Sequence, residues 1–450
     1  MVQDASQETA PVMRDAGGDS GRDAGIDRFV PEDAFTSPPD GCPGSVLTSP
    51  LGTPIWSTPL TTDRYLVGPL AANPEGGTYF ADDGFLVGGS VDGGPSILAL
   101  TPCGKVAWRV AWGHPANTGT ETFLIVSGSR LVAVESDVEA FDLATGAHLW
   151  TADLLGFAAV HGQGGLTADQ VLVATPAVAA DGTVYVLFNA PAVVWLLAID
   201  TTSAVSLLAT VPIDGDGGFA TDLILDVAGR LDVSTVATNF NPGPGSMLSF
   251  ARDGTLAWRA SLAGVSYENL ILSGESFLLS EDNGERFGLD GGLAGSSDAF
   301  TKPAAVDHTE AGAAVYAIGG SEIAIRQDTQ GRLVWSSVLA PNGFHEFTGG
   351  PLVGDGAHVF YLVQLLGSTS DGGDRITTGV YAVAKADGGK QTWEFDASSP
   401  GYMLHTAAGE LVFSMGSSAV AIASGGERPS GSVWPTPRGG ADQRGAAIGQ

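Results

Sequence analysis

Residues 140–150 read AFDLATGAHLW, and the glycine turn and tryptophan of this stretch recur along the chain. Six further tryptophans follow a similar turn, namely Trp56, Trp108, Trp258, Trp335, Trp393 and Trp434, as Trp150 does here. Two longer intervals contain degenerate copies, AIDTTSAVSLL with Leu208 and FGLDGGLAG with Gly295 at the tryptophan position. Consecutive copies are then about 47 residues apart, which indicates a structural repeat.

A second recurring element lies between these copies, an apolar run with a Gly-containing turn. PAVAADGTVYVLF (176–188) is the clearest, and seven others occur at 78–89, 123–134, 223–234, 270–280, 314–325, 352–363 and 404–415. Alternating Val, Leu, Phe and Tyr bounded by Gly, Asp and Asn predict β-hairpins, and no amphipathic helix longer than two turns is expected.

A repeat of this length with four short strands is typical of a propeller blade. The sequence therefore predicts an all-β fold, an eight-bladed β-propeller of four-stranded antiparallel blades. Seven blades are the alternative if the copies at Leu208 or Gly295 are misread. Nine tryptophan positions for eight apolar runs leave one copy over. We expect the strand around IWSTPL (55–60) to complete the blade begun by residues 401–424, which removes an exposed sheet edge.

The pattern Ala-x-Asp-x-x-Thr-Gly-x-x-x-Trp resembles the tryptophan-docking motif of the pyrroloquinoline-quinone (PQQ)-like propeller family. AFDLATGAHLW matches this motif best, and SVWPTPRGGADQRGAA (432–447) resembles the C-terminal segment of such proteins. The resemblance covers residues 45–450. It implies that each tryptophan packs across the next blade, and the family includes both quinoprotein dehydrogenases and the non-catalytic lipoprotein BamB.

Catalytic members of that family bind PQQ and Ca²⁺ through Glu, Asn and Asp, and cap the quinone with two adjacent cysteines. This chain has neither a Cys-Cys pair nor a Cys-x-x-Cys-His motif. The Asp-rich turns at 213–222 and 280–285 lack the full series of oxygen ligands that Ca²⁺ requires. We therefore expect no cofactor, no metal site and no catalytic residue. A quinoprotein-type dehydrogenase or a carbohydrate-active propeller enzyme is the alternative.

Loops that join each outer strand to the next inner strand gather around one mouth of a propeller, and such loops usually carry binding residues. They are expected at 61–73, 113–121, 155–175, 212–221 and 340–350. The candidate binding residues are Arg64, His161, Asp216, His345 and Glu346. The simpler interpretation is that these are ordinary solvated loop residues.

Fifty acidic residues against twenty basic ones give a net charge of −30, which excludes a nucleic-acid partner. No apolar run is long enough to span a membrane. Residues 1–44, rich in Asp, Ala, Gly and Pro, predict a disordered linker ahead of the propeller at 45–450.

This acidic tract resembles the spacers of exported bacterial proteins. We expect a binding or scaffolding protein of the periplasm or cell surface, with a lipid anchor on its precursor and a protein or glycan partner. A cytosolic protein with a disordered tail is the alternative. Cys42 and Cys103 would form a disulfide in an oxidising compartment and remain two free thiols in the cytosol.

Overall fold

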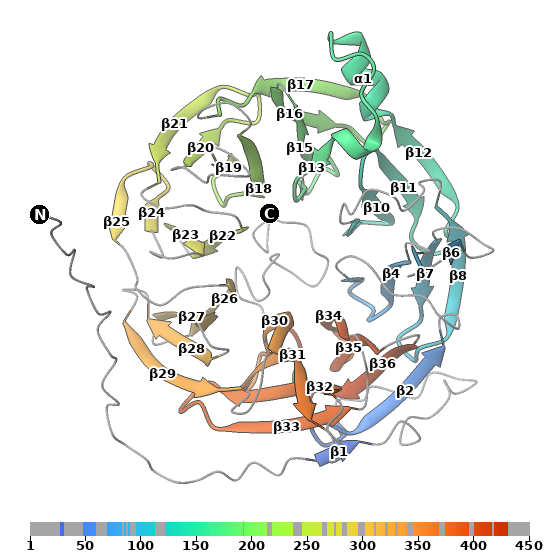
Figure 1. Ribbon diagram of the computed structural model, residues 1–450, viewed down its shortest axis with the longest axis vertical. Helices are drawn as coiled ribbons and strands as arrows, with labels where there is room; N and C mark the ends of the chain where they lie inside the picture. The colour runs from blue at the N-terminus through green and yellow to red at the C-terminus, as the bar shows by residue number, and fades with distance from the viewer. Residues whose placement is uncertain are drawn as a thin grey trace, which may run out of the picture.

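The chain folds into a ring of β-sheets around a central axis, seen end-on in the computed structural model (Figure 1). The structure describes residues 28–30, 48–59, 70–82, 85–86, 89–90, 96–112, 122–191, 193–213, 218–236, 245–262, 268–273, 276–280, 286–295, 302–309, 312–319, 323–328, 332–339, 345–368, 374–395, 400–415 and 418–430.

Eight sheets follow one another around the ring, and each is a blade with its first strand innermost. Blades 1 and 2 consist of β3 (Ala71–Ala72), β4 (Thr78–Asp82), β7 (Ser96–Leu100) and β8 (Val106–Ala111), then β9 (Phe123–Ser127), β10 (Arg130–Val134), β11 (Val138–Asp142) and β12 (His148–Ala152). Blades 3 and 4 consist of β13 (Leu172–Val173), β14 (Ala177–Val178), β15 (Val184–Ala190), β16 (Val193–Ile199) and β17 (Val205–Thr210), then β18 (Phe219–Leu225), β19 (Leu231–Val236), β20 (Ser246–Phe250) and β21 (Leu256–Ser261).

Blades 5 and 6 consist of β22 (Glu268–Ser273), β23 (Ser276–Ser280), β24 (Arg286–Gly288) and β25 (Leu293–Gly295), then β26 (Lys302–Thr309), β27 (Gly312–Gly319), β28 (Ile323–Asp328) and β29 (Leu333–Val338). Blade 7 consists of β30 (His345–Val353), β31 (His358–Ser368), β32 (Asp374–Ala384), β33 (Lys390–Phe395) and the added β1 (Arg28–Val30). Blade 8 consists of β34 (Pro400–His405), β35 (Glu410–Met415), β36 (Ser418–Ala423) and β2 (Pro54–Pro59). A separate hairpin pairs β5 (Phe85–Leu86) with β6 (Gly89–Ser90).

The all-β propeller predicted from the repeat is confirmed, and its sheets of four or five strands number eight in the part of the chain that the structure describes. Both degenerate copies are outer strands, because Leu208 lies in β17 and Gly295 in β25. The seven-bladed alternative is therefore not needed to explain these two segments.

The ring closes where the sequence predicted, through a strand from each end of the propeller. β2 is antiparallel to β36, with Trp56 opposite Ala421 and Pro59 opposite Ser418. Trp56 is 1% exposed and joins Leu404 and Val412 of blade 8 and Phe80 of blade 1 in one hydrophobic cluster.

Apolar side chains fill the spaces between consecutive blades, and this packing holds the ring together. Clusters of buried residues join blades 8 and 1, 1 and 2, 2 and 3, 3 and 4, 6 and 7, and 7 and 8. Because neither face of a blade can be buried without its neighbours, each interface contributes to the stability of the whole ring.

The tryptophans on the outer strands lie against a glycine turn of the following blade. A Cβ on Gly104 would overlap the Trp56 indole, and a Cβ on Gly146 would overlap that of Trp108. The same arrangement places Trp258 against Gly291, Trp335 against Gly388 and Trp393 against Gly52. Trp150 is half-buried against the cluster between blades 2 and 3, and Trp434 lies outside the described residues.

Within residues 1–44, predicted to be a disordered linker, Arg28–Val30 form β1 at the outer edge of blade 7. The pairing is parallel, whereas the strands within the blades are antiparallel to one another. The described part of the chain contains no helix long and apolar enough to cross a membrane.

Candidate functional site

The two faces of the propeller differ in the connections that they carry. Four antiparallel strands end on the side where the first one began, so connections between blades all lie on one face, here named the loop face. The turns that join first to second strands, and third to fourth, lie on the opposite face, here named the turn face.

The connection from blade 2 to blade 3 is the largest that the structure describes on the loop face. It forms helix α1 (Leu154–Val160) and a 3-10 turn (Ala168–Gln170), and it projects beyond the ring (Figure 1). Asp153 is the N-cap residue, since Gly156 N–H donates to its Oδ1 over 2.6 Å. Leu154 N–H donates to Asp137 Oδ1 over 2.9 Å, which ties the helix to blade 2.

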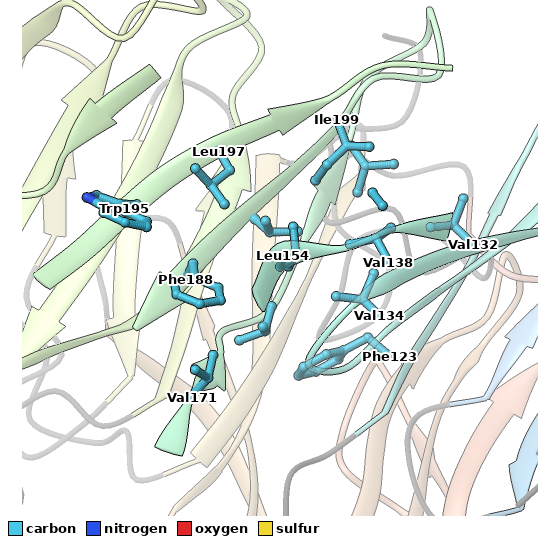
Figure 2. Close-up of a cluster of buried hydrophobic side chains, with 14 of the residues drawn as sticks. Phe123, Val132, Val134, Val138, Leu154, Val171, Phe188, Trp195, Leu197 and Ile199 are labelled. Carbon is cyan, nitrogen blue, oxygen red and sulfur yellow. The ribbon is translucent and has the colours of Figure 1, made fainter. Parts of the chain in front are cut away.

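One side of α1 is embedded in the core between blades 2 and 3. Leu154 and Ala158 are fully buried in that cluster, and Figure 2 shows Leu154 between the strands of the two blades. They are four positions apart and so lie on the same side of the helix. The helix is therefore fixed on the propeller by packing.

An aromatic group holds the C-terminal end of α1 against blade 3. The His161 ring stacks on Phe157 with centroids 4.0 Å apart, and its Nδ1 lies 2.9 Å from the carbonyl oxygen of Phe157. Both rings meet Trp195 of β16 edge-on, at 6.1 and 6.2 Å. The His161 side chain is exposed, whereas Trp195 is only 5% exposed. The imidazole ring therefore covers part of the buried apolar surface that Trp195 forms.

The outward side of this segment exposes apolar side chains beside uncharged polar ones. Val160 is 84% exposed and Leu172 is 42% exposed, and residues 154–168 contain no Asp, Glu, Lys or Arg. Phe157 and Leu166 are only partly buried. We name this set the α1 surface: Leu155, Phe157, Val160, His161, Leu166 and Leu172. Val160 is the most exposed large apolar side chain among the described residues.

The structure places the predicted binding residues in different parts of the molecule. His161 lies at the rim beside α1, whereas His345 and Glu346 begin β30, an inner strand near the axis (Figure 1). Arg64 and Asp216 lie outside the described residues. His161 and the start of β30 are therefore not brought together into one site.

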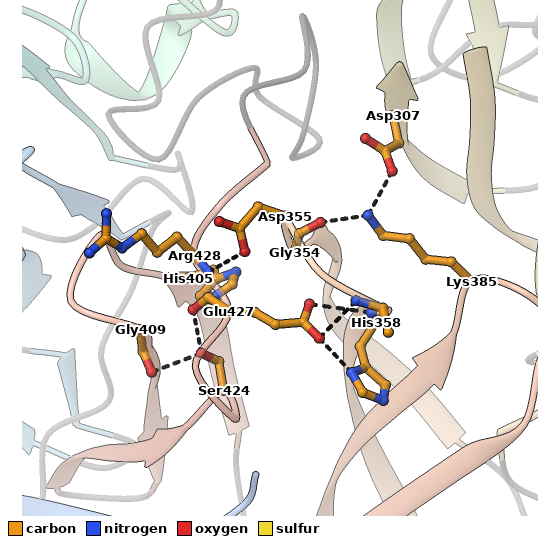
Figure 3. A network of polar contacts seen from close by, with 11 residues as sticks. Asp307, Gly354, Asp355, His358, Lys385, His405, Gly409, Ser424, Glu427 and Arg428 are labelled. Carbon is orange, nitrogen blue, oxygen red and sulfur yellow. Dashed lines mark hydrogen bonds and ion pairs between the residues drawn. The ribbon is translucent and has the colours of Figure 1, made fainter. Parts of the chain in front are cut away.

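A second polar cluster, on the turn face, was not foreseen from the sequence. Residues 424–430 leave the end of β36 and cross towards blades 7 and 6 (Figure 3), and we name this segment the C-terminal strap. The carboxylate of Glu427 accepts hydrogen bonds from Ala357 N–H over 3.0 Å and His358 N–H over 3.2 Å. Its Oε1 also lies 2.6 Å from His358 Nδ1.

The strap makes a further contact with blade 7 and then one with blade 6. Arg428 N–H donates to Asp355 Oδ1 over 2.8 Å, and Ser430 Oγ donates to Asp307 Oδ1 over 3.0 Å. Lys385 Nζ donates to the other oxygen of Asp307 and to the carbonyl of Gly354, each over 2.6 Å. This cluster links three blades and is largely buried, which indicates a structural role.

The ionisable groups beside the strap have pKa values shifted by their surroundings. Burial alone would raise the pKa of Glu427, but the hydrogen bonds and positive potential of His358 and the backbone N–H groups lower it overall. His405 is fully buried, with Nε2 3.0 Å from the carbonyl of Glu427, and burial lowers its pKa to about 4. Glu410 is 2% exposed, and burial raises its pKa to about 8.

Sequence reasoning treated each histidine separately and so missed that His358 and His405 both contact Glu427. The path of the strap after β36, which the sequence does not show directly, brings these residues together. The α1 helix did leave a signal, since Asp153 followed by LLGFAAV is a capping residue before an apolar helical turn.

Among the described residues, no group of three or more His, Cys, Asp or Glu side chains is placed to hold a metal ion. The acidic residues 214, 216, 281, 282 and 285 of the two Asp-rich turns lie outside those residues. Cys103 is disulfide-bonded, and the one other cysteine of the chain, Cys42, lies outside the described part.

The closed ring of four-stranded sheets, with a tryptophan of one blade against a glycine turn of the next, defines a β-propeller of repeated blades. The family model described as "Outer membrane protein assembly factor BamB" matches residues 44–290, more than half of the chain. The chain belongs to this family, and the resemblance found in its repeats is confirmed.

Two solved propeller structures share the fold at low sequence identity, and a third similar structure is BamB. The Dos1 propeller is 13% identical, with 86% of this chain and 98% of that chain covered and a TM-score of 0.51. The WD40 domain of SCAP from fission yeast is 10% identical, with 82% and 98% covered and a TM-score of 0.50. BamB from Moraxella catarrhalis is 14% identical, with 79% and 84% covered and a TM-score of 0.41. No curated protein matches the chain in sequence.

Proposed function

We propose that this protein is a non-enzymatic scaffold of the bacterial cell envelope that binds a partner protein through the α1 surface. The observation that carries the proposal is an uncharged helix on the loop face with a buried side and an exposed apolar side. A rigid scaffold that presents such a segment is suited to protein binding.

The family supports the cellular setting of this proposal. Its model bears the description of an outer-membrane assembly factor, and the acidic tract at 1–44 resembles the spacers of exported proteins. We place the protein in the periplasm or at the cell surface, with a lipid anchor on its precursor. A Cys42–Cys103 disulfide suits an oxidising compartment, and peptide mapping without reductant tests this pairing.

We also propose that the protein works without PQQ or Ca²⁺, because the chain lacks the adjacent cysteines that cap the quinone in catalytic relatives. Incubation with PQQ and Ca²⁺ should leave no quinone absorbance on the protein after gel filtration. Bound quinone together with dye-linked alcohol oxidation would replace this proposal with the dehydrogenase alternative.

A photo-crosslinking residue at Val160 tests the binding surface directly. In cells of the native host, it should crosslink to one envelope protein, and the Val160→Glu variant should reduce capture of that protein at least 10-fold. Val106, 50% exposed on outer strand β8, is the matched control for both the crosslinker and the glutamate.

Equal crosslinking from Val160 and Val106, or capture unaffected by Val160→Glu, would contradict the assignment of the α1 surface. Binding that survives digestion of the envelope proteins but is lost on enzymatic removal of glycans would identify a glycan partner instead.

A further inference from the structure

The outer edge of blade 7 carries a strand that the propeller repeat does not supply. β1 pairs in parallel with β33, with Arg28 opposite Trp393, Phe29 opposite Glu394 and Val30 opposite Phe395. Among the described strands, the other outer strands β2, β8, β12, β17, β21, β25 and β29 have no such partner on their outer edges.

Side chains along β33 are more buried than those of outer strand β21. Thr392, Trp393 and Phe395 are 2%, 4% and 1% exposed, whereas no residue of β21 is buried and four of its six residues are exposed. Buried side chains alone do not mark a covered edge, because β2 has no added strand and also buries Trp56 and Thr58, so the covered edge of β33 is defined by its pairing with β1. An open edge strand offers unpaired N–H and C=O groups to any extended chain, and at β33 these groups face a partner.

The sequence of β1 and its flanks favours a short strand. Phe29 and Val30 have high strand propensity and lie within GIDRFVPED, in a tract otherwise rich in Asp, Gly and Ala. Pro31 follows directly, and because proline lacks an N–H group it ends the pairing.

Three paired residues form a weak contact, since each hydrogen bond contributes only about 0.5–1.5 kcal/mol net. The contact benefits from its tether, because residues 31–53 link β1 to β2 of the neighbouring blade. A covalent link between two paired segments raises the effective concentration of one at the other. A longer or better-matched strand can therefore displace β1.

We propose that the outer edge of β33 is a strand-accepting site for an extended segment of a partner protein, which β1 occupies until that segment replaces it. The site takes a parallel strand of at least three residues without proline, with apolar residues at the positions of Phe29 and Val30. A basic residue at the position of Arg28 suits a propeller with a net charge of −30. This surface is separate from the α1 surface, so the inference goes beyond the proposed function.

A fluorescent peptide of residues 24–34, AGIDRFVPEDA, tests the site on the full-length chain. Phe29→Pro in the chain removes the competing strand and should increase peptide affinity at least 10-fold over the wild-type chain. Phe35→Pro, a proline in the same tract but outside β1, is the matched control and should behave as wild type. A peptide with proline at the position of Phe29 should bind none of the chains.

Hydrogen exchange provides a readout that does not depend on the peptide's affinity. The outward-facing amides of β33 should lose protection in Phe29→Pro and regain it when the peptide is added. Equal peptide binding by all three chains, or none by Phe29→Pro, would overturn the proposal.

Two further measurements distinguish a partner strand from a second copy of the chain, and the β33 edge from the α1 surface. A dimer of the wild-type chain that Phe29→Pro abolishes would overturn the partner assignment, because the occupant would then be a second copy. Val160→Glu should leave peptide binding unchanged, so the α1 surface and the β33 edge succeed or fail independently.

Discussion

Gly146 shows why the repeat needs a glycine and a tryptophan at a fixed spacing. Its φ is +70°, a backbone conformation that side chains rarely adopt, and a Cβ there would overlap the Trp108 indole of the previous blade. Trp108 Nε1–H also donates to the carbonyl of Leu143 in the same turn, over 3.1 Å. Each copy of the repeat therefore supplies a glycine turn for contact with the previous blade and a tryptophan indole for contact with the following blade.

Gly146→Ala and Gly128→Ala separate backbone strain from the loss of this contact. Both glycines have positive φ, but nothing lies within 4 Å of a Cβ built on Gly128. We expect Gly128→Ala to lower the free energy of unfolding by about 1 kcal/mol. Gly146→Ala should cost about 1–3 kcal/mol more because the indole must move. Urea denaturation measures both, and equal costs would show that the ring can shift freely.

Glu410 makes stability depend on pH. Trp56 Nε1–H donates to its Oε1 over 3.3 Å, and burial raises its pKa to about 8, against an ordinary value of 4.5. Between these two values the folded state holds a proton that the unfolded state lacks, so stability falls as pH rises through this window.

The Glu410→Gln variant should therefore lose less stability than the wild type when pH is raised from about 5 to about 8. The difference should reach about 1 kcal/mol or more, since one unit of pKa shift corresponds to about 1.4 kcal/mol. Glu75→Gln changes an exposed carboxylate and should follow the wild type. Parallel pH profiles for Glu410→Gln and the wild type would show that Glu410 titrates as an exposed carboxylate does.

Among the elements, the C-terminal strap joins blade 8 to blade 7 through the side chain of Glu427 and the backbone of Arg428. The carboxylate of Glu427 accepts from two backbone N–H groups of the turn between β30 and β31. Arg428 instead bonds through its backbone, since its N–H donates to Asp355 and its carbonyl accepts from Asp355 N–H.

Glu427→Ala should lower the free energy of unfolding by about 2–4 kcal/mol, because several donors lose a charged acceptor. Arg428→Ala is the neighbouring control and should change it by less than about 0.5 kcal/mol, because the exposed side chain carries none of these backbone bonds. Chemical denaturation measures both variants. A similar loss in the two would indicate that the strap acts through the path of its backbone alone.

Pairing of β2 with β36 closes the ring and should stabilise it. Deletion of residues 45–60 removes Trp56 and leaves β36 with an open edge, so we expect the melting temperature to fall by more than about 10 °C. A synthetic peptide of residues 45–60 added in excess should restore part of this loss. An unchanged melting temperature on deletion would show that blade 8 is stable with three strands.

The elements were predictable where a local pattern encodes them. The spacing of the tryptophans predicted where each blade lies in the sequence. Even the degenerate copy before Leu208 keeps its turn, because Ser203 has a φ of 72°, in the left-handed region. The three-residue β1 was not predictable, because it lies outside the repeat, in a tract whose composition predicts disorder. The His358–Glu427 pair was not predictable either, because it depends on the path of the C-terminal strap, which the repeat does not encode.

At the scale of the whole molecule, the net charge of −30 opposes compaction. Salt shortens the range of this repulsion from about 30 Å at 0.01 M to about 8 Å at 0.15 M. We expect the melting temperature in scanning calorimetry to rise by several degrees between these concentrations. Sucrose of equal osmolality provides the control. A lower melting temperature in salt would mean that attractive pairs such as Lys385–Asp307 outweigh the repulsion.

The pairing of β2 with β36 has a consequence for synthesis on the ribosome. Residues 54–59 are made more than 350 residues before the strand that they join, residues 418–423. Blade 8 cannot form until residues 418–423 have been translated, so Trp56 and its strand remain without their final neighbours until then. The chain consequently stays an open arc of blades until both strands are available, and only then becomes a closed ring.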